Sequence, residues 1–207
     1  MKFNGDGPIV ALDIDGTLAD YHGWFLPFAE LFCGKPMPDA KDINPGLPLH
    51  KHMGISKATY RECKLAFRQG GMKRSMPCYE GASELTRAIR KAGAEVWITT
   101  TRPYLRYDRI DKDTRIWMRR NGIQYDAVLY GEHKYRDLVR NVGASRVVAV
   151  LDDLPEMVMQ ATALGVDGII RDQPYNKHFS WHLRADDLAD AQRWILKRLE
   201  QWKIQHG

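Results

Sequence analysis

The sequence contains no long hydrophobic run and few cysteines. No apolar stretch approaches the roughly 18 residues that a membrane-spanning helix needs, and residues 1–8 lack the basic and hydrophobic parts of a signal peptide. The three cysteines, Cys33, Cys63 and Cys78, form no CxxC pair, so neither a disulfide framework nor a zinc site is indicated. We therefore expect a soluble, cytoplasmic protein with reduced thiols and no contact with a membrane.

Internal repeats, low-complexity segments and a strong charge of one sign are missing as well. The 207 residues include 31 basic and 26 acidic side chains, a net charge of +5, which suits an anionic substrate without demanding nucleic acid. No GxxxxGK(S/T) loop occurs, so the chain carries no P-loop kinase site. A chain of this length supports one main domain with an insertion.

Short apolar runs alternate with helical patterns along most of the chain. Five runs have the continuous apolar character of strands buried on both faces of a parallel sheet: 8–13, 95–99, 126–130, 146–151 and 168–171. Apolar residues recur at helical spacing in five further segments: 85–92, 116–118, 138–142, 155–165 and 185–205. This alternation predicts an α/β fold, a Rossmann-like doubly wound parallel sheet.

The stretch from Asp20 to Cys78 departs from this rhythm. It is too long for a loop in a compact domain, and it contains two helical patterns, 24–32 and 56–69, joined by a connection rich in proline and glycine. We interpret it as a small helical cap inserted after the first strand. The predicted domains are a catalytic core of residues 1–19 and 79–207 and a cap of residues 20–78.

Acidic residues follow two of the predicted strands. Asp13 and Asp15 end the first strand, and Asp152 and Asp153 end the fourth. Ligands of open α/β sheets bind at the carboxyl ends of the strands, and carboxylates that converge there form a site for a hard cation, of which Mg²⁺ is the usual occupant.

Neutral and basic side chains complete this predicted site. The second strand ends in Thr100 and Thr101, whose hydroxyl and backbone N–H groups suit a phosphate oxyanion. Lys134, which opens the helix before the fourth strand, is placed to balance the carboxylates, and Lys112 lies in the same interval.

These residues resemble the four motifs of the haloacid dehalogenase superfamily of phosphotransferases: DIDGT, a threonine after an apolar strand, a lysine, and a strand that ends in DD. The resemblance implies that Asp13 attacks phosphorus and forms an aspartyl-phosphate. It implies that Asp15 protonates the leaving oxygen and then deprotonates water, a role that favours a raised pKa. An aspartate at this second position is typical of phosphatases and mutases and disfavours dehalogenase chemistry.

The same resemblance assigns the remaining ligands. Magnesium is held by Asp13, by the backbone carbonyl of Asp15 and by the pair Asp152 and Asp153, whose separate roles the sequence leaves open. Thr100, Thr101 and Lys134 are expected to bind the transferring phosphoryl group.

Shorter pieces resemble the 5′(3′)-deoxyribonucleotidase family. They are DIDGTLADYHGWF at 13–25, PCYEGA at 77–82, and NKH at 176–178 followed by ADD at 185–187. Two features depart from that family: Arg102 follows the threonines, and Lys134 stands 152 − 134 = 18 residues before Asp152. Both are similar to the phosphatase domain of polynucleotide kinases, which lacks this large cap.

We expect Trp24, Phe25 and Phe28 of the cap to stack on a nucleobase. Arg102 is expected to touch the phosphate or the sugar, while the basic residues that follow it form a solvated face: Arg106, Arg109, Lys112, Arg115, Arg119 and Arg120.

The sequence thus predicts a magnesium-dependent phosphatase of (deoxy)nucleoside monophosphates that acts through an Asp13 phosphoenzyme. Two enzymatic alternatives stay open, a 3′-phosphatase of polynucleotide ends and a phosphatase of small sugar phosphates. A catalytically silent nucleotide-binding module is the alternative from another class. The expected partner is a small phosphate ester, nucleic acid is less favoured, and a homodimer stays open.

Overall fold

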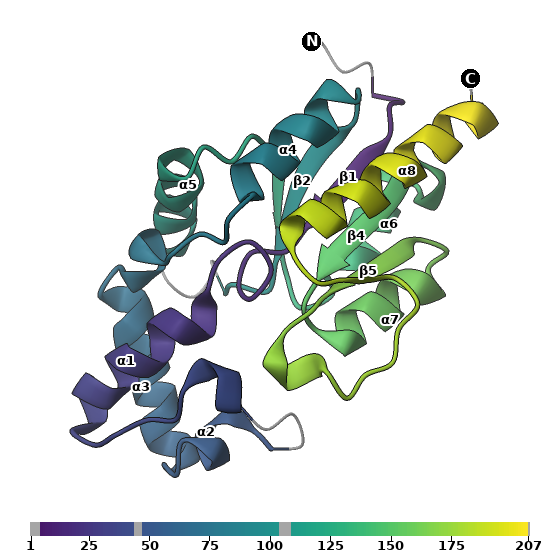
Figure 1. Ribbon diagram of the computed structural model, residues 1–207. Coiled ribbons are helices and arrows are strands. Elements are labelled where there is room, and N and C mark those ends of the chain that lie inside the picture. Colours follow the sequence, from purple (N-terminus) through teal and green to yellow (C-terminus); the bar gives the residue numbers. More distant parts are fainter. Residues whose placement is uncertain (1–4, 44–46, 104–108, 207) are drawn as a thin grey trace.

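A computed structural model describes residues 5–43, 47–103 and 109–206 of the chain. Within these residues, six parallel strands form one sheet in the order β3-β2-β1-β4-β5-β6 (Figure 1). Because β1 lies between β2 and β4, the strand order changes direction there, and such a point is where ligands bind in open α/β sheets. The strands are β1 Ile9–Leu12, β2 Glu95–Thr100, β3 Ala127–Tyr130, β4 Val147–Asp152, β5 Asp167–Arg171 and β6 Arg184–Ala185.

Helices cover both faces of the sheet, which confirms the predicted doubly wound α/β fold. Val10 and Leu12 of β1 face one hydrophobic core and Ala11 faces the other, as the alternation of side chains along a strand requires. The first core is shared with α4 and α8, and the second with α6 and α7. These helices are α4 Ala82–Lys91, α6 Lys134–Val142, α7 Pro155–Ala163 and α8 Leu188–His206.

The start of the last helix differs from the sequence prediction. The helix begins at Leu188 rather than at Ala185, because Arg184 and Ala185 pair with β5 as the short strand β6. Backbone pairing on the edge of the sheet thus takes precedence over the helical spacing of the apolar side chains. The five strands predicted from apolar runs are all present.

The segment between β1 and α4 forms a group of helices beyond the carboxyl ends of the strands (Figure 1). Asp20 caps the first helix by accepting a hydrogen bond from the Gly23 N–H, and Ser56 caps another by accepting one from the Thr59 N–H. The helices are α1 Tyr21–Cys33, α2 Leu49–His52 and α3 Lys57–Gln69, with the 3₁₀ turns η1 Ala40–Asp42 and η2 Met72–Ser75.

The chain enters and leaves this helical group at neighbouring points. Ala19 and Cys78 form an antiparallel bridge, the Asp20 N–H donates to the Pro77 carbonyl at 3.0 Å, and the Tyr79 N–H donates to Leu18 at 2.9 Å. The two chain segments that join the helical group to the sheet are therefore hydrogen-bonded to each other.

η2, near the end of the inserted segment, packs against α5 (Ile110–Arg120) of the sheet domain. The indole N–H of Trp117 in α5 donates to the Met76 carbonyl at 2.9 Å, and both residues are buried. This contact fixes the return path of the inserted segment beside the carboxyl end of β2. No helix in the described part of the chain has the length and apolar character needed to cross a membrane.

The close approach of β5 to α7 gives a prediction for stability. A Cβ atom at Gly168 would lie 2.7 Å from Cγ1 and 2.8 Å from the carbonyl oxygen of Val158. We expect Gly168→Ala to lower the free energy of unfolding by about 1–3 kcal/mol, because backbone must shift to admit the methyl group. Denaturant unfolding measures this. In the control Gly7→Ala the new Cβ meets no atom within 4 Å, and equal stability of the two variants would contradict the packing argument.

Candidate active site

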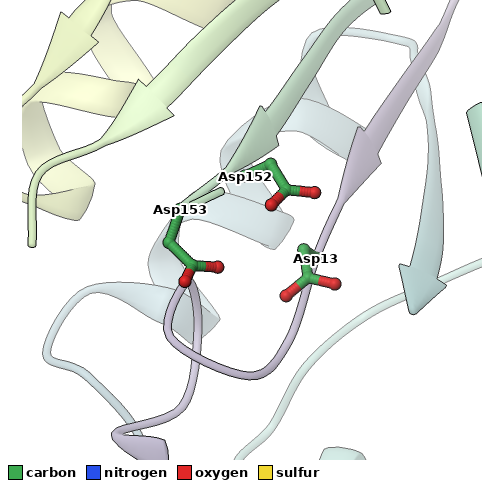
Figure 2. A group of neighbouring side chains, drawn as sticks. All are labelled: Asp13, Asp152 and Asp153. Atoms are coloured by element: carbon green, nitrogen blue, oxygen red, sulfur yellow. The ribbon is translucent and has the colours of Figure 1, made fainter. Parts of the chain in front are cut away.

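Three aspartates meet at the carboxyl ends of the two central strands. Asp13 follows β1, Asp152 is the last residue of β4, and Asp153 comes next (Figure 2). Each offers one carboxylate oxygen to a cluster in which these atoms lie within 4.8 Å of one another, and all three residues are buried. The Asp13 N–H donates to Leu151 at 3.0 Å, which locks the two strand ends in register.

Lys134 partly neutralises this cluster. Its ammonium lies 2.5 Å from Oδ1 of Asp13 and 2.6 Å from Oδ2 of Asp152, with 1% of its side chain exposed. It is the first residue of α6, so a backbone position at the start of a helix delivers it to the ends of β1 and β4. The structure therefore brings Lys134 into the predicted place, whereas Lys112 is exposed on α5.

One ammonium among three buried carboxylates leaves an excess of negative charge. Burial raises the pKa of Asp13 to about 7, with Asp152 adding to the rise and Lys134 opposing it. Burial and the charge of Asp152 also raise the pKa of Asp153 well above its usual range. A set of oxygen donors with unbalanced negative charge is what a hard divalent cation requires, so these residues fit such an ion.

Hydroxyl and amide donors hold Asp153. Thr17 donates to its Oδ1 at 3.0 Å, Tyr175 donates to its Oδ2 at 2.6 Å, and the side chain of Asn176 donates to its carbonyl at 2.7 Å. The turn after β1 makes room for this arrangement through Gly16, whose φ of +96° favours glycine and whose Cβ would lie 2.5 Å from the Tyr175 hydroxyl.

Asp15 points to a different set of partners. Its carboxylate accepts two hydrogen bonds from Arg102, Nη2 to Oδ1 at 2.5 Å and Nε to Oδ2 at 3.1 Å, and it also pairs with the ammonium of Lys73. Burial alone would raise the pKa of Asp15, but Arg102 and then Lys73 outweigh it and hold the pKa well below its usual range. The expectation of a raised pKa is therefore wrong for this arrangement, because two cations stabilise the charged form.

Lys73 was not identified from the sequence. It lies in η2, is 3% exposed, and its ammonium rests 4.2 Å from the centre of the Tyr21 ring. It reaches Asp15 across 58 positions of the chain, and no spacing motif links the two. In the sequence Lys73 stands two positions after Gly71, and this context does not distinguish it from an ordinary surface lysine.

The carboxyl end of β2 places Thr100 and Arg102 beside these carboxylates. Thr100 is 1% exposed, and its hydroxyl accepts a hydrogen bond from the Arg102 N–H at 3.3 Å. Thr101 is exposed. Arg102 also donates to the Thr114 hydroxyl at 2.8 Å, so its guanidinium is held by both Asp15 and Thr114.

The aromatic side chains of the inserted helices are used largely for packing. Phe25 has no exposed surface, lies stacked on Tyr21 and meets Phe67 edge to face, so the expected stacking of a base on Phe25 is wrong. Phe28 also contacts Phe67, with ring centres 5.2 Å apart, but it is half-buried, as is Trp24. Phe25 and Phe67 belong to the same hydrophobic cluster as Val10 and Leu12 of β1, so these rings continue the core of the sheet into the inserted helices.

The basic residues after Arg102 are exposed where the structure describes them, as predicted: Arg109, Lys112, Arg115, Arg119 and Arg120. Arg115 pairs with Asp111 at 2.9 Å. Arg106 lies outside the described residues.

An aspartate after the first strand, a lysine from a crossover helix and an acidic pair after the fourth strand, together with this sheet, define a haloacid dehalogenase-like phosphatase. Residues 7–201 match the family described as 5′ nucleotidase, deoxy (pyrimidine), cytosolic type C protein (NT5C). The chain belongs to this family and is a phosphoric monoester hydrolase of the nucleotidase type. No curated protein sequence matches the chain.

Solved structures share the fold at low sequence identity. A "predicted phosphatase" from Clostridium acetobutylicum has a TM-score of 0.67 at 14% identity, with 92% of this chain and 99% of that chain covered. A haloacid dehalogenase family hydrolase from Deinococcus radiodurans, with bound phosphate and sodium, has a TM-score of 0.66 at 14% identity, with 94% and 97% covered. A "predicted phosphoglycolate phosphatase" from Haemophilus somnus has a TM-score of 0.63 at 13% identity, with 91% and 98% covered.

The ion pairs of Asp15 give a prediction about its titration. Its pKa lies below the ordinary value of about 3.9, so the pairs stabilise the folded protein above that pH and lose this effect as the pH falls further. We expect Arg102→Met to raise the pKa of Asp15 more than Lys73→Met does, because Arg102 has the larger effect. Carboxyl ¹³C NMR measures both values.

The exposed pair of Arg87 and Glu84 supplies the control for this titration. Arg87→Met should leave the pKa of Asp15 unchanged. An Asp15 pKa that stays low in both the Arg102 and Lys73 variants would show that the two cations do not set it.

Proposed function

We propose that the protein hydrolyses (deoxy)nucleoside monophosphates by transferring the phosphoryl group to Asp13. The observation that carries this proposal is the position of Asp13, which is buried at the end of β1 and shares the ammonium of Lys134 with Asp152. Membership of the nucleotidase family supports the substrate class, and its description as a cytosolic type supports a cytoplasmic location.

In the first step a carboxylate oxygen of Asp13 bonds to phosphorus, and the bond from phosphorus to the ester oxygen breaks. Asp15, once protonated, donates its proton to the leaving sugar oxygen. In the second step Asp15 takes a proton from water, the water oxygen bonds to phosphorus, and the aspartyl-phosphate breaks to release phosphate. Lys134 stabilises negative charge on Asp13 and on the transferred group throughout.

The ion pairs of Asp15 connect substrate binding to this proton transfer. Arg102 and Lys73 are the cations nearest to this carboxylate, and both are the natural partners of a phosphate dianion. A bound phosphate would compete for them, and loss of either pair would let burial raise the pKa of Asp15. The low pKa of the free enzyme is therefore compatible with an acid role in the complex.

Thr100 and the backbone of Thr101 are proposed to bind phosphoryl oxygens at the end of β2. Asp13, Asp152, Asp153 and the carbonyl of Asp15 would hold Mg²⁺. When bound, the cation would reduce the repulsion between the phosphate and the Asp13 carboxylate.

Residues 20–78 are proposed to form a cap on a core of residues 1–19 and 79–207. The pairing of Ala19 with Cys78 supports these boundaries, because the chain leaves the core and returns to it at neighbouring residues. Such a cap would exclude water from a small substrate and leaves Trp24 and Phe28 as candidates for base contact.

Turnover of a panel of phosphate esters tests the substrate class. We expect deoxynucleoside monophosphates to be hydrolysed with kcat/KM at least about tenfold above that of sugar phosphates, and Asp13→Asn to lower phosphate release about a thousandfold or more, because it removes the nucleophile. Glu200→Gln, a change of an exposed carboxylate on α8, is the control. Faster turnover of sugar phosphates or of 3′-phosphorylated oligonucleotides would reject the proposal, and full activity of Asp13→Asn would reject the nucleophile.

Metal removal tests the carboxylate cluster. We expect chelation to abolish phosphate release and Mg²⁺ to restore it. Asp153→Asn should raise the Mg²⁺ concentration for half-maximal activity at least about tenfold, because one anionic ligand is lost. Glu200→Gln again serves as control, and activity that survives complete chelation would contradict the assignment.

A further inference from the structure

One face of α3 borders a cavity that the catalytic steps above do not use. Its volume is about 590 Å³, within the range of small-molecule sites. Basic side chains dominate its lining, with one carboxylate and an aromatic ring: Lys57, Arg61, Lys64, Arg68, Glu62 and Tyr60. The cavity therefore favours an anionic ligand with a flat apolar part.

The charge of this cavity is poorly balanced within the protein. Lys57, Arg61 and Lys64 form no ion pair with a carboxylate among the residues that the structure describes. Lys64 is half-buried, and its ammonium lies 5.2 Å from the centre of the Tyr60 ring. Burial and then the nearby charge of Arg68 lower the pKa of Lys64 to about 8. A bound anion would relieve this repulsion.

Arg68, which lines the cavity, stands five residues before Lys73, the residue that pairs with Asp15 at the proposed phosphoryl-transfer site. Burial lowers the pKa of Lys64, and the negative charge of Asp15 opposes this effect. Burial also lowers the pKa of Lys73, and the positive charge of Arg68 adds to this effect. α3 packs against η2, which carries Lys73. From Arg68 to Lys57 the helix rises by about 16 Å at 1.5 Å per residue. The basic face thus extends away from the site over a length greater than one phosphate group.

We propose that this cavity binds a second phosphate group of the substrate, so that the preferred substrates are nucleoside 3′,5′-bisphosphates. This inference rests on the proposed function, since the first phosphate must occupy the site at Asp13. Lysine and arginine side chains are suited to phosphate oxygens, and the Tyr60 ring offers a surface for the base. A single cavity of this size favours a small bisphosphate over a polynucleotide, whose binding uses a groove that follows successive nucleotides.

The experiment compares thymidine 3′,5′-bisphosphate with thymidine 5′-monophosphate. For the wild-type enzyme we expect kcat/KM for the bisphosphate to exceed that for the monophosphate at least about tenfold. Lys64→Gln and Lys57→Gln should each reduce this ratio about threefold or more. Lys51→Gln removes an exposed charge on α2 outside the cavity lining and should keep the wild-type ratio. Thermal unfolding confirms that each variant is folded.

The outcomes separate the two proposals. Hydrolysis of the monophosphate with no preference for the bisphosphate, or a ratio unaffected by both cavity variants, overturns the second-phosphate site and leaves the nucleotidase assignment intact. Failure to hydrolyse either compound overturns the proposed function. A 3′-phosphorylated oligonucleotide that is preferred to the bisphosphate, with this preference lost in Lys64→Gln, would instead identify the cavity as a polynucleotide site.

Discussion

Three buried carboxylates and one ammonium lie together at the carboxyl ends of β1 and β4, and the rest of the site follows from this constraint. Asp13 and Asp152 come from neighbouring parallel strands, so their closeness is built into the register of β1 and β4. Lys134 compensates part of the negative charge, and the hydroxyl groups of Thr17 and Tyr175 donate hydrogen bonds to Asp153. The remaining excess of negative charge explains why the cluster suits a divalent cation.

A second charged group lies beside the first and joins the inserted helices to the sheet. Asp15 is shared by Arg102, at the end of β2, and Lys73, from the inserted segment. The position of η2 against α5 therefore affects the charge state of a residue in the proposed proton transfer. In the proposed mechanism, substrate binding, proton transfer and the placement of the inserted helices are therefore coupled through the carboxylate of Asp15.

Much of the fold could be predicted because its strands form continuous apolar runs, and the central strands β1 and β4 are buried at every residue. Asp13, Lys134 and the pair Asp152 and Asp153 could be found because each follows or begins such a local element. Lys73 could not, since its contact with Asp15 depends on how a 3₁₀ turn packs against α5. The two-residue strand β6 is likewise too short to carry a periodic signal.

The antiparallel bridge between Ala19 and Cys78 has an evolutionary consequence. The polypeptide leaves and rejoins the sheet domain within one hydrogen-bonded pair, so an insertion at this junction need not disturb the strand order or the carboxylates. Exchange of the inserted segment at this junction would keep the three clustered aspartates of the sheet domain, but it would also remove Lys73, which pairs with Asp15. A replacement segment would therefore have to bring its own cation to this position if both ion pairs of the carboxylate are to be inherited.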